Sequence, residues 1–173
     1  FTETATNCSA TTSAITVNPL PNATIGAPSP ANTCQNGTIS MILNGSSTNT
    51  AGRPFTFAYN INGTPQATIN SINTGTTAPI PVTTTTAGTF VYTLTSVSNN
   101  YGCIRNITTP AGNQSRTIVI NPLPSLTTNS QINVSCNGGN DGTVTVVATG
   151  ASSPYTYTWN TSPIQTNAMA TNL

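Results

Sequence analysis

The sequence has almost no charged side chains. Only 3% of its 173 residues are charged, where an ordinary soluble domain has about a quarter, and lysine and histidine are absent. The ionic residues are Glu3, Arg53, Arg105, Arg116 and Asp141. Binding of nucleic acid requires several cations along a phosphate track, and electrostatic attachment to anionic lipid requires a basic cluster. Three scattered arginines provide neither, so the composition excludes both kinds of partner.

The scarcity of titratable groups also argues against catalysis. General acid–base catalysis needs such groups together in one site, and the two carboxylates, Glu3 and Asp141, lie far apart in the chain. Serine, threonine and cysteine nucleophiles have no histidine or lysine to activate them. We therefore expect no enzyme activity and no cofactor. No apolar run approaches the roughly 18 residues of a membrane-spanning helix, so we expect no membrane span within these residues.

One motif occurs twice and divides the chain. The run Ile15-Thr16-Val17 ends at Asn18-Pro19-Leu20-Pro21, and 103 residues later Ile118-Val119-Ile120 ends at Asn121-Pro122-Leu123-Pro124. Both runs are typical of strands, and proline has no N–H for a β-ladder, so each strand must stop at the motif. The spacing is about the size of one β-sandwich domain. We interpret the two Asn-Pro-Leu-Pro motifs as short, stiff joints between consecutive domains.

The remaining sequence shows the two-residue alternation of β-strands and no helical period. Phe55, Phe57, Tyr59 and Ile61 share one face of a predicted strand, and Asn62-Gly63 follows as a hairpin turn. The sequence thus predicts an all-β chain of tandem β-sandwiches joined by short proline-rich linkers. Besides an edge strand or loop at Pro79 and Pro81, further strands are expected at 14–17, 23–25, 38–43, 67–72, 89–97, 103–107, 116–120, 143–149 and 154–159.

The two joints divide the chain into three segments. We interpret residues 1–21 as the C-terminal strand or strands of a preceding sandwich and residues 22–124 as one complete sandwich. Residues 125–173 are interpreted as the N-terminal half of a further sandwich, because their aromatic strand follows the second strand, as it does in the middle segment. We expect these residues to be a window of a longer chain, with end domains completed by further residues or by another chain.

The four cysteines follow the same period. Cys34 and Cys136 lie near the start of their segments, 102 residues apart, and Cys8 and Cys103 lie near the end of theirs. We therefore expect a Cys34–Cys103 disulfide inside the complete sandwich, with Cys8 and Cys136 paired outside this window. Free thiols or a metal site are the alternatives, and the metal is disfavoured without histidine or a CxxC motif. Disulfides would place the chain in an oxidising, extracytoplasmic compartment. No disulfide should bridge an Asn-Pro-Leu-Pro joint.

Two local features have a functional alternative. The turn that holds Asn137, Asn140 and Asp141 superficially resembles a calcium loop, but such loops use more than one carboxylate. A tight glycine-rich turn is the favoured interpretation, and these three residues remain a weak calcium candidate. Tyr157 and Trp159 could form a platform for stacking sugars, although alternating aromatic residues are more often core.

The C-terminal segment resembles a known family of repeats. The run Val134-Ser135-Cys136-Asn137-Gly138-Gly139-Asn140-Asp141-Gly142-Thr143, then Ala148-Thr149-Gly150 and the aromatic strand Pro154–Trp159, resembles the SprB repeat. These repeats occur in giant surface adhesins of gliding Bacteroidetes. The middle segment, with Ala87-Gly88-Thr89-Phe90-Val91-Tyr92-Thr93-Leu94, is similar to the Ig-like or PKD-like modules found in the same proteins.

The resemblance implies a non-catalytic stalk segment of a large exported adhesin. It implies type IX secretion, display on the outer membrane, and a role in adhesion and gliding. The expected partners are neighbouring repeats, the surface motility and secretion machinery, and extracellular polysaccharide or substratum. Two alternatives stay open, a carbohydrate-binding module and a spacer domain of a secreted hydrolase.

Overall fold

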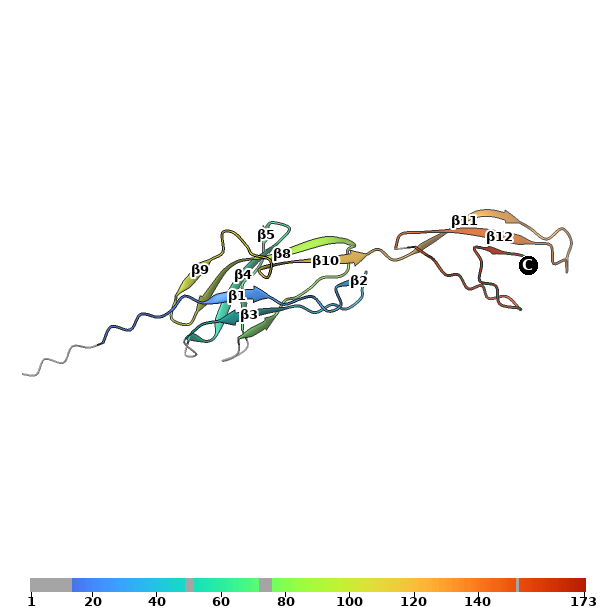
Figure 1. The fold of residues 1–173 in the computed structure, drawn as a ribbon. Coiled ribbons are helices and arrows are strands. Elements are labelled where there is room, and N and C mark those ends of the chain that lie inside the picture. Colours follow the sequence, from blue (N-terminus) through green and yellow to red (C-terminus); the bar gives the residue numbers. More distant parts are fainter. Residues whose placement is uncertain (1–13, 49–51, 72–75, 152) are drawn as a thin grey trace, which may run out of the picture.

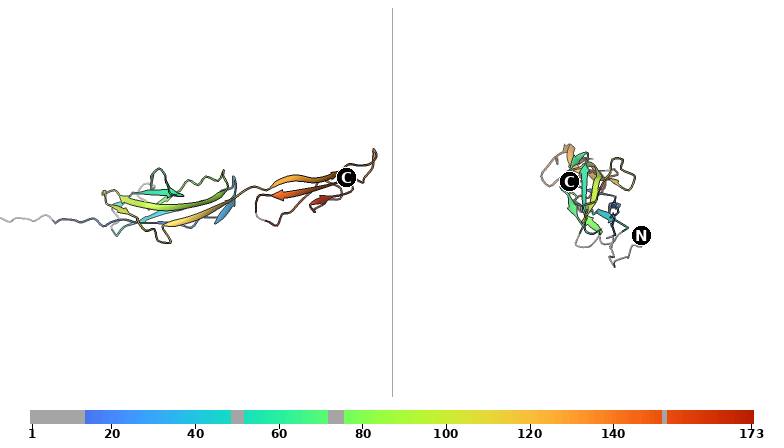
Figure 2. Two further views of the ribbon diagram at one scale, coloured as in Figure 1. Left: turned by 90° about the horizontal axis from the view of Figure 1, so that it is seen from above. Right: turned by 90° about the vertical axis from the view of Figure 1, so that its left-hand side faces the viewer.

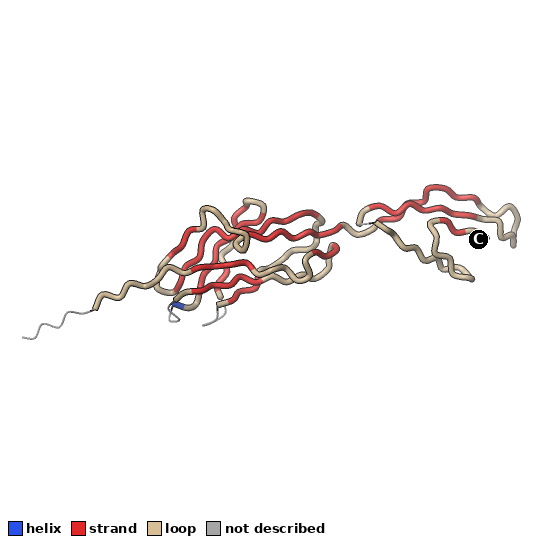
Figure 3. Tube along the Cα trace, in the orientation of Figure 1, coloured by secondary structure: helices blue, strands red, loops and turns tan. Residues whose placement is uncertain are grey.

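Two β-units follow one another along the chain (Figure 1). The computed structural model describes residues 14–48, 52–71, 76–151 and 153–173. These contain strands and loops but no α-helix, and the short helical stretch in Figure 3 is a 3₁₀ turn at Gly52. The two units lie in line along one axis, and they overlap when viewed from the N-terminal side (Figure 2). The expected all-β architecture is therefore confirmed.

The first unit is a sandwich of two sheets. One sheet has the order β1-β3-β7, and the other has the order β2-β10-β8-β4-β5, with β6 on β4 and β9 on β8. Its strands are β1 (Asn22–Ile25), β2 (Asn32–Cys34), β3 (Ile42–Ser46), β4 (Phe55–Ile61), β5 (Thr64–Pro65), β6 (Ile69–Asn70), β7 (Thr77–Pro79), β8 (Gly88–Asn99), β9 (Ile104–Asn106) and β10 (Ser115–Asn121).

The core lies between the two sheets. β4 alternates between buried and partly exposed residues, because its period of two places Phe55, Phe57 and Tyr59 on the inner face. Phe57 is fully buried, and the Tyr59 and Tyr92 rings stack with centroids 6.3 Å apart. The other buried apolar residues of this core are Ala23, Ile25, Met41, Leu43, Ala78, Ile80, Leu94, Val97, Ile118 and Ile120.

A hairpin turn and a β-bulge set the register of the larger sheet. Asn62 and Gly63 have φ values of 50° and 82°, the positive values that a type I′ hairpin turn requires, so the predicted hairpin is confirmed. Between β4 and β8, Ala58 pairs with Ser96 and Tyr59 pairs with Leu94. One residue of β8 is therefore left without a partner in this ladder and forms a β-bulge. The bulge reverses the alternation of β8. Tyr92 and Leu94 therefore face inward before it, and Val97 and Asn99 face inward after it.

The second unit is a single open sheet. It consists of β11 (Ser125–Ile132), β12 (Thr143–Thr149) and β13 (Met169–Ala170), in that order. All eight residues of β11 are exposed, and Leu126 keeps 62% of its surface accessible. Among the described residues, no second sheet covers the inner face of this unit.

The first hairpin of each unit has the same strand pairing. Asn22 pairs with Ser46 in the β1–β3 ladder, and Ser125 pairs with Thr149 in the β11–β12 ladder. Both positions differ by 103 residues, the same offset as the two joints. The β11–β12 hairpin therefore corresponds to β1 and β3 of the complete sandwich.

Several strand predictions were wrong or incomplete. Residues 14–17 form no strand and are exposed, since no neighbouring strand in the described part of the chain pairs with them. The aromatic run 154–159 keeps its alternation of exposure but belongs to no ladder. The strand expected at 67–72 is limited to β6, and its last residue lies outside the described residues. β2, β5, β11 and β13 were not predicted. The edge position of Pro79, in β7, is confirmed.

The tyrosine pair predicts loss of stability in alkali. Burial raises the pKa of Tyr59 and of Tyr92 above the ordinary 10.0, and the neighbouring Tyr59 raises that of Tyr92 further. Above about pH 10 the unfolded chain loses these protons while the folded chain keeps them, so stability is fully present below that pH and falls above it. Thermal melts should show a constant unfolding temperature from about pH 6 to 9 and a decrease above 10.

A Tyr92→Phe variant provides the control for this prediction. Phenylalanine keeps the ring in the core but has no proton to lose, so the alkaline decrease should be smaller than in the parent. An equal decrease in both proteins would contradict the assignment.

Candidate functional site

The first joint is fastened to the sandwich by side chains of β9 and the loop before it. The Nε of Arg105 donates to the carbonyl oxygen of Pro21 at 2.6 Å, and Pro21 itself is buried. The Sγ of Cys103 lies 3.8 Å from the carbonyl oxygen of Asn18. The Oδ1 of Asn99 accepts the backbone N–H of Cys103 and so holds the loop in place. The joint is anchored by these contacts as well as by its prolines.

The second joint is fastened by one side chain of the first unit. The backbone N–H of Gln35 donates to the carbonyl oxygen of Asn121 at 2.9 Å, and its Oε1 accepts the N–H of Leu123 at 3.2 Å. Its Nε2 donates to the carbonyl oxygen of Thr85. Gln35 therefore connects three segments, and it limits how far Leu123 can turn away from the sandwich.

A glycine of the second unit closes this joint from the other side. Gly150 has a φ of +81°, and a Cβ atom at this position would lie 2.5 Å from the carbonyl oxygen of Leu123. Only glycine satisfies both conditions, because other residues rarely adopt this φ and any Cβ would overlap the oxygen. The turn after β12 thus fits directly against the joint.

The expected Cys34–Cys103 disulfide is not formed. Cys34, Cys103 and Cys136 are free thiols. Cys34 pairs with Asn121 at one end of the sandwich, whereas Cys103 follows the Asn99 end of β8. β8 alone is long enough to separate these ends by about 36 Å, and a disulfide needs Cα atoms within about 7 Å. The regular placement of the cysteines within the repeat period therefore did not mean that Cys34 and Cys103 lie close together in space. Cys8 lies outside the described residues.

Cys136 and the weak calcium candidate lie in the turn between β11 and β12. The Oδ1 of Asp141 accepts the backbone N–H of Ser135 at 2.9 Å. The hydrogen bond from the Ser135 side chain, followed by that from its backbone, lowers the pKa of Asp141 below its ordinary value. The carboxylate thus closes its own turn. Within the described ranges, no three histidine, cysteine or acidic side chains gather where they could hold a metal.

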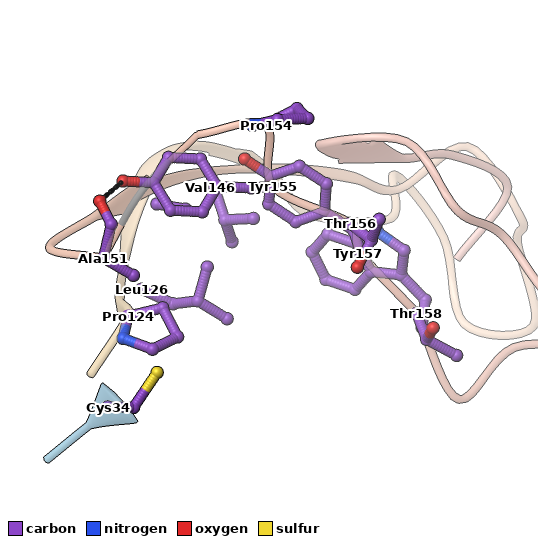
Figure 4. Close-up of a pocket in the computed structure, with 12 residues that line it drawn as sticks. Cys34, Pro124, Leu126, Val146, Ala151, Pro154, Tyr155, Thr156, Tyr157 and Thr158 are labelled. Carbon is purple, nitrogen blue, oxygen red and sulfur yellow. Dashed lines mark hydrogen bonds between the residues drawn. The ribbon is translucent and has the colours of Figure 1, made fainter. Parts of the chain in front are cut away.

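An apolar groove lies in the second unit. A groove of about 520 Å³ is bounded by Pro124, Leu126, Val146 and Ala148 on one side. The run Tyr155–Trp159 forms the other side, and Cys34 lies at the end next to the joint (Figure 4). No charged residue lines this groove.

Two of the aromatic rings are held in place by their polar atoms. The hydroxyl of Tyr155 donates to the carbonyl oxygen of Gly150 at 2.6 Å. It also lies 3.4 Å from the carbonyl oxygen of Ala151, the contact that is dashed in Figure 4. The Nε1 of Trp159 donates to the carbonyl oxygen of Asn167 at 2.7 Å. These bonds leave the apolar faces of Tyr155 and Trp159 as the surface that a partner would meet.

Comparison with the complete sandwich identifies the groove. Tyr155, Tyr157 and Trp159 alternate directly after Pro154, as Phe55, Phe57 and Tyr59 alternate after Pro54. In the first unit these side chains are buried in the core, whereas the three in the second unit are only half-buried. The aromatic run therefore has the spacing of the core face of β4, but its rings are less buried.

The sequence did not indicate the residues that hold the joints. Arg105 was expected only as one of three scattered cations, and nothing in the pattern distinguished Gln35 from other polar residues. Gly150 had a usable signal, since it stands between a strand and a proline, where a residue of positive φ is common.

The fold and the joints define a class of protein, the tandem-repeat chains built from Ig-like β-sandwiches. The comparisons place one part of the chain more closely: residues 128–163 match the family model of the SprB repeat. The chain therefore carries an SprB-repeat region, which starts within β11 and ends just after the aromatic run. The SprB repeat is a structural repeat associated with cell-surface proteins. No curated protein and no solved structure matched the chain. The part of the chain that the structure describes has no helix able to cross a membrane.

Substitution of Gly150 should loosen the second joint. A Gly150→Ala variant places a Cβ against Leu123 and holds a non-glycine residue at positive φ, which costs about 1–3 kcal/mol. We expect the second unit to unfold at a lower temperature and residual dipolar couplings to show a changed orientation of the two units. Gly112→Ala is the matched control, since a Cβ there meets nothing within 4 Å. Equal stability of both variants would contradict the contact.

The Asp141 turn predicts a specific response to acid. Because the folded pKa is lowered, the turn is fully stabilised above the ordinary value of 3.8 and weakens as pH falls through the lowered pKa. NMR titration of the Asp141 carboxyl carbon should show a midpoint below 3.8. A Ser135→Ala variant should raise that midpoint, whereas Ser130→Ala should leave it unchanged. A midpoint at the ordinary value in the parent would overturn the assignment.

Proposed function

We propose that this chain is a non-catalytic stalk segment of a large exported repeat adhesin on the bacterial cell surface. The observation that supports it is the repetition at an offset of 103 residues, which includes both the joint and the register of the first hairpin. Units that repeat in this way, each fastened to the next by a short joint, form a thread that transmits force along its axis. The SprB-repeat region supports the assignment to a surface adhesin.

The remaining parts of the proposal concern the setting of the thread. We assign residues 22–124 to one complete sandwich, residues 1–21 to the end of a preceding one and residues 125–173 to the first half of an SprB-type sandwich. The adhesin would be exported by type IX secretion and attached to the outer membrane, where it supports adhesion and gliding. Its partners would be neighbouring repeats, the surface motility and secretion machinery, and extracellular polysaccharide or substratum.

A carbohydrate-binding module is the second candidate, and the aromatic groove is the observation in its favour. The equivalence of Tyr155, Tyr157 and Trp159 with the buried Phe55–Tyr59 face favours the stalk instead. A residue set that lies in a core in one unit is expected to complete a core in the next.

Replacement of the segment in cells tests the proposal. A spacer acts through its length, so an unrelated β-sandwich pair of equal length should preserve adhesion. Deletion of the segment should reduce adhesion, because it brings the distal binding region closer to the cell. Loss of adhesion in the equal-length replacement would contradict the stalk and support a binding module.

Solution scattering of the purified chain provides an independent test. Strands of about ten residues give each unit a length of roughly 30–40 Å, and the near absence of charge should make the overall length insensitive to salt. A variant with both Pro122→Gly and Pro124→Gly should be shorter on average, because its joint bends more easily. A compact globule, or a strong contraction with salt in the parent, would contradict the stalk.

A further inference from the structure

Tension on the joints enters and leaves the first unit through β1 and β10. The first joint leads into β1 and β10 leads into the second joint, and the two joints lie at opposite ends of the sandwich (Figure 1). A pull on the joints therefore acts along the strands. Because the hydrogen bonds of an antiparallel ladder are perpendicular to its strands, such a pull loads them in shear, and several must break together.

The two strands are held unequally by their ladders. β10 has seven residues and lies between two neighbours, β8 and β2. β1 has only four residues, and in the described part of the chain it pairs only with β3, at the edge of the smaller sheet. If the ladders alone bore the tension, β1 would be the first strand to detach.

The loop before β10 ties β1 to the larger sheet. The N–H of Ile25 donates to the carbonyl oxygen of Asn113 at 2.7 Å, and the Nε2 of Gln114 donates to the carbonyl oxygen of Ala23 at 3.4 Å. The loop itself is anchored in that sheet, because the N–H of Leu94 in β8 donates to the carbonyl oxygen of Gln114 at 2.9 Å. Gln114 directly precedes β10, so β1 is bonded to the start of that strand.

Arg105 adds a bond at the point where the first joint enters the sandwich. Its Nε donates to the carbonyl oxygen of Pro21, and Arg105 lies in β9, which pairs with β8 of the larger sheet. A hydrogen bond with an ionised donor is stronger than a neutral one. Since Pro21 is also buried, tension must break this bond and withdraw Pro21 from the sandwich before it reaches β1.

The loop that holds β1 is closed by its own hydrogen bonds. The N–H of Gln114 donates to the carbonyl oxygen of Ala111 at 2.8 Å, and its Oε1 accepts the N–H of Ala111 at 3.0 Å. The guanidinium of Arg116 donates to the carbonyl oxygens of Gly112 and Ser115. A loop closed in this way passes tension on to β10, because it has little slack to stretch.

We propose that Arg105, Asn113 and Gln114 form a mechanical clamp, which passes tension from the first joint and β1 directly into the larger sheet and β10. The inference rests on the proposed stalk function, in which tension enters through the joints. β10 carries the tension along its backbone to Asn121 and the second joint, where Gln35 holds the exit with its two bonds. The core between the sheets therefore stays closed at tensions that would detach an unclamped β1.

Lifetimes under constant force test the clamp. The full chain is held by its two ends, and unfolding of the first unit is recognised by a gain in length of roughly 300 Å, from its about 100 residues. Forced unfolding reports the unfolding rate rather than the equilibrium stability. The double variant Arg105→Met and Gln114→Met should shorten the lifetime at least about tenfold, because it removes two bonds between the β1 region and the larger sheet.

Asn62→Gly is the matched control. Asn62 connects the hairpin turn to β8 through two side-chain bonds, from its Nδ2 to the carbonyl oxygen of Thr89 and from the N–H of Val91 to its Oδ1. Glycine keeps the positive φ of this position. Both variants should melt below the parent, but the control should keep the parent's lifetime, since Asn62 lies outside the path of the tension. A short lifetime in the control, or a parent-like lifetime in the double variant, would overturn the clamp.

A second pulling geometry separates a clamp from a general stabilising role. When the handles are attached at Thr64 and at the C-terminus, tension no longer enters through β1, so the double variant and the parent should have similar lifetimes. The same tenfold weakening in both geometries would mean that Arg105 and Gln114 only stabilise the fold. These lifetimes belong to the purified chain, whereas the equal-length replacement in cells tests the stalk, so the failure of one proposal is distinguishable from the failure of the other.

Discussion

Burial of one aromatic face against one short hairpin is the interaction on which this structure depends. In the first unit, β4 places Phe55, Phe57 and Tyr59 over the inner face of β1 and β3, and the longer strands β8 and β10 enclose them. The second unit has the same hairpin and an equivalent aromatic run, but nothing in the described residues supplies the enclosing strands. One interaction therefore produces a closed core in one unit and an open groove in the other.

Much of this could be predicted from the sequence because the signals were local. The alternation from Phe55 to Ile61, the Asn62-Gly63 turn and the end of β10 before Pro122 all depend on signals within a few residues, and the structure confirms them. The strands at 14–17 and 154–159 were wrong for the opposite reason. A ladder needs a partner strand, and alternation alone does not show whether that partner is present.

The cysteines show where a repeat can mislead. Equal phase in the sequence suggested that Cys34 and Cys103 belong together, but phase reports only the position along a repeat. The long strand β8 carries the chain from one end of the sandwich to the other, and the two thiols lie at these opposite ends. Gln35, Arg105 and Gly150 were missed because their roles depend on contacts between distant segments, which composition and periodicity do not contain.

The constant offset between the two hairpins bears on how such a chain can change over generations. Loss or gain of one 103-residue period moves Ile118–Ile120 onto the position of Ile15–Val17 and keeps every joint in phase. Genetic recombination between repeats would therefore add or remove whole periods, while each remaining hairpin keeps its pairing. Loops can absorb other differences in length, since Pro54 and Pro154 lie 100 residues apart, whereas an insertion inside a hairpin strand would break its pairing.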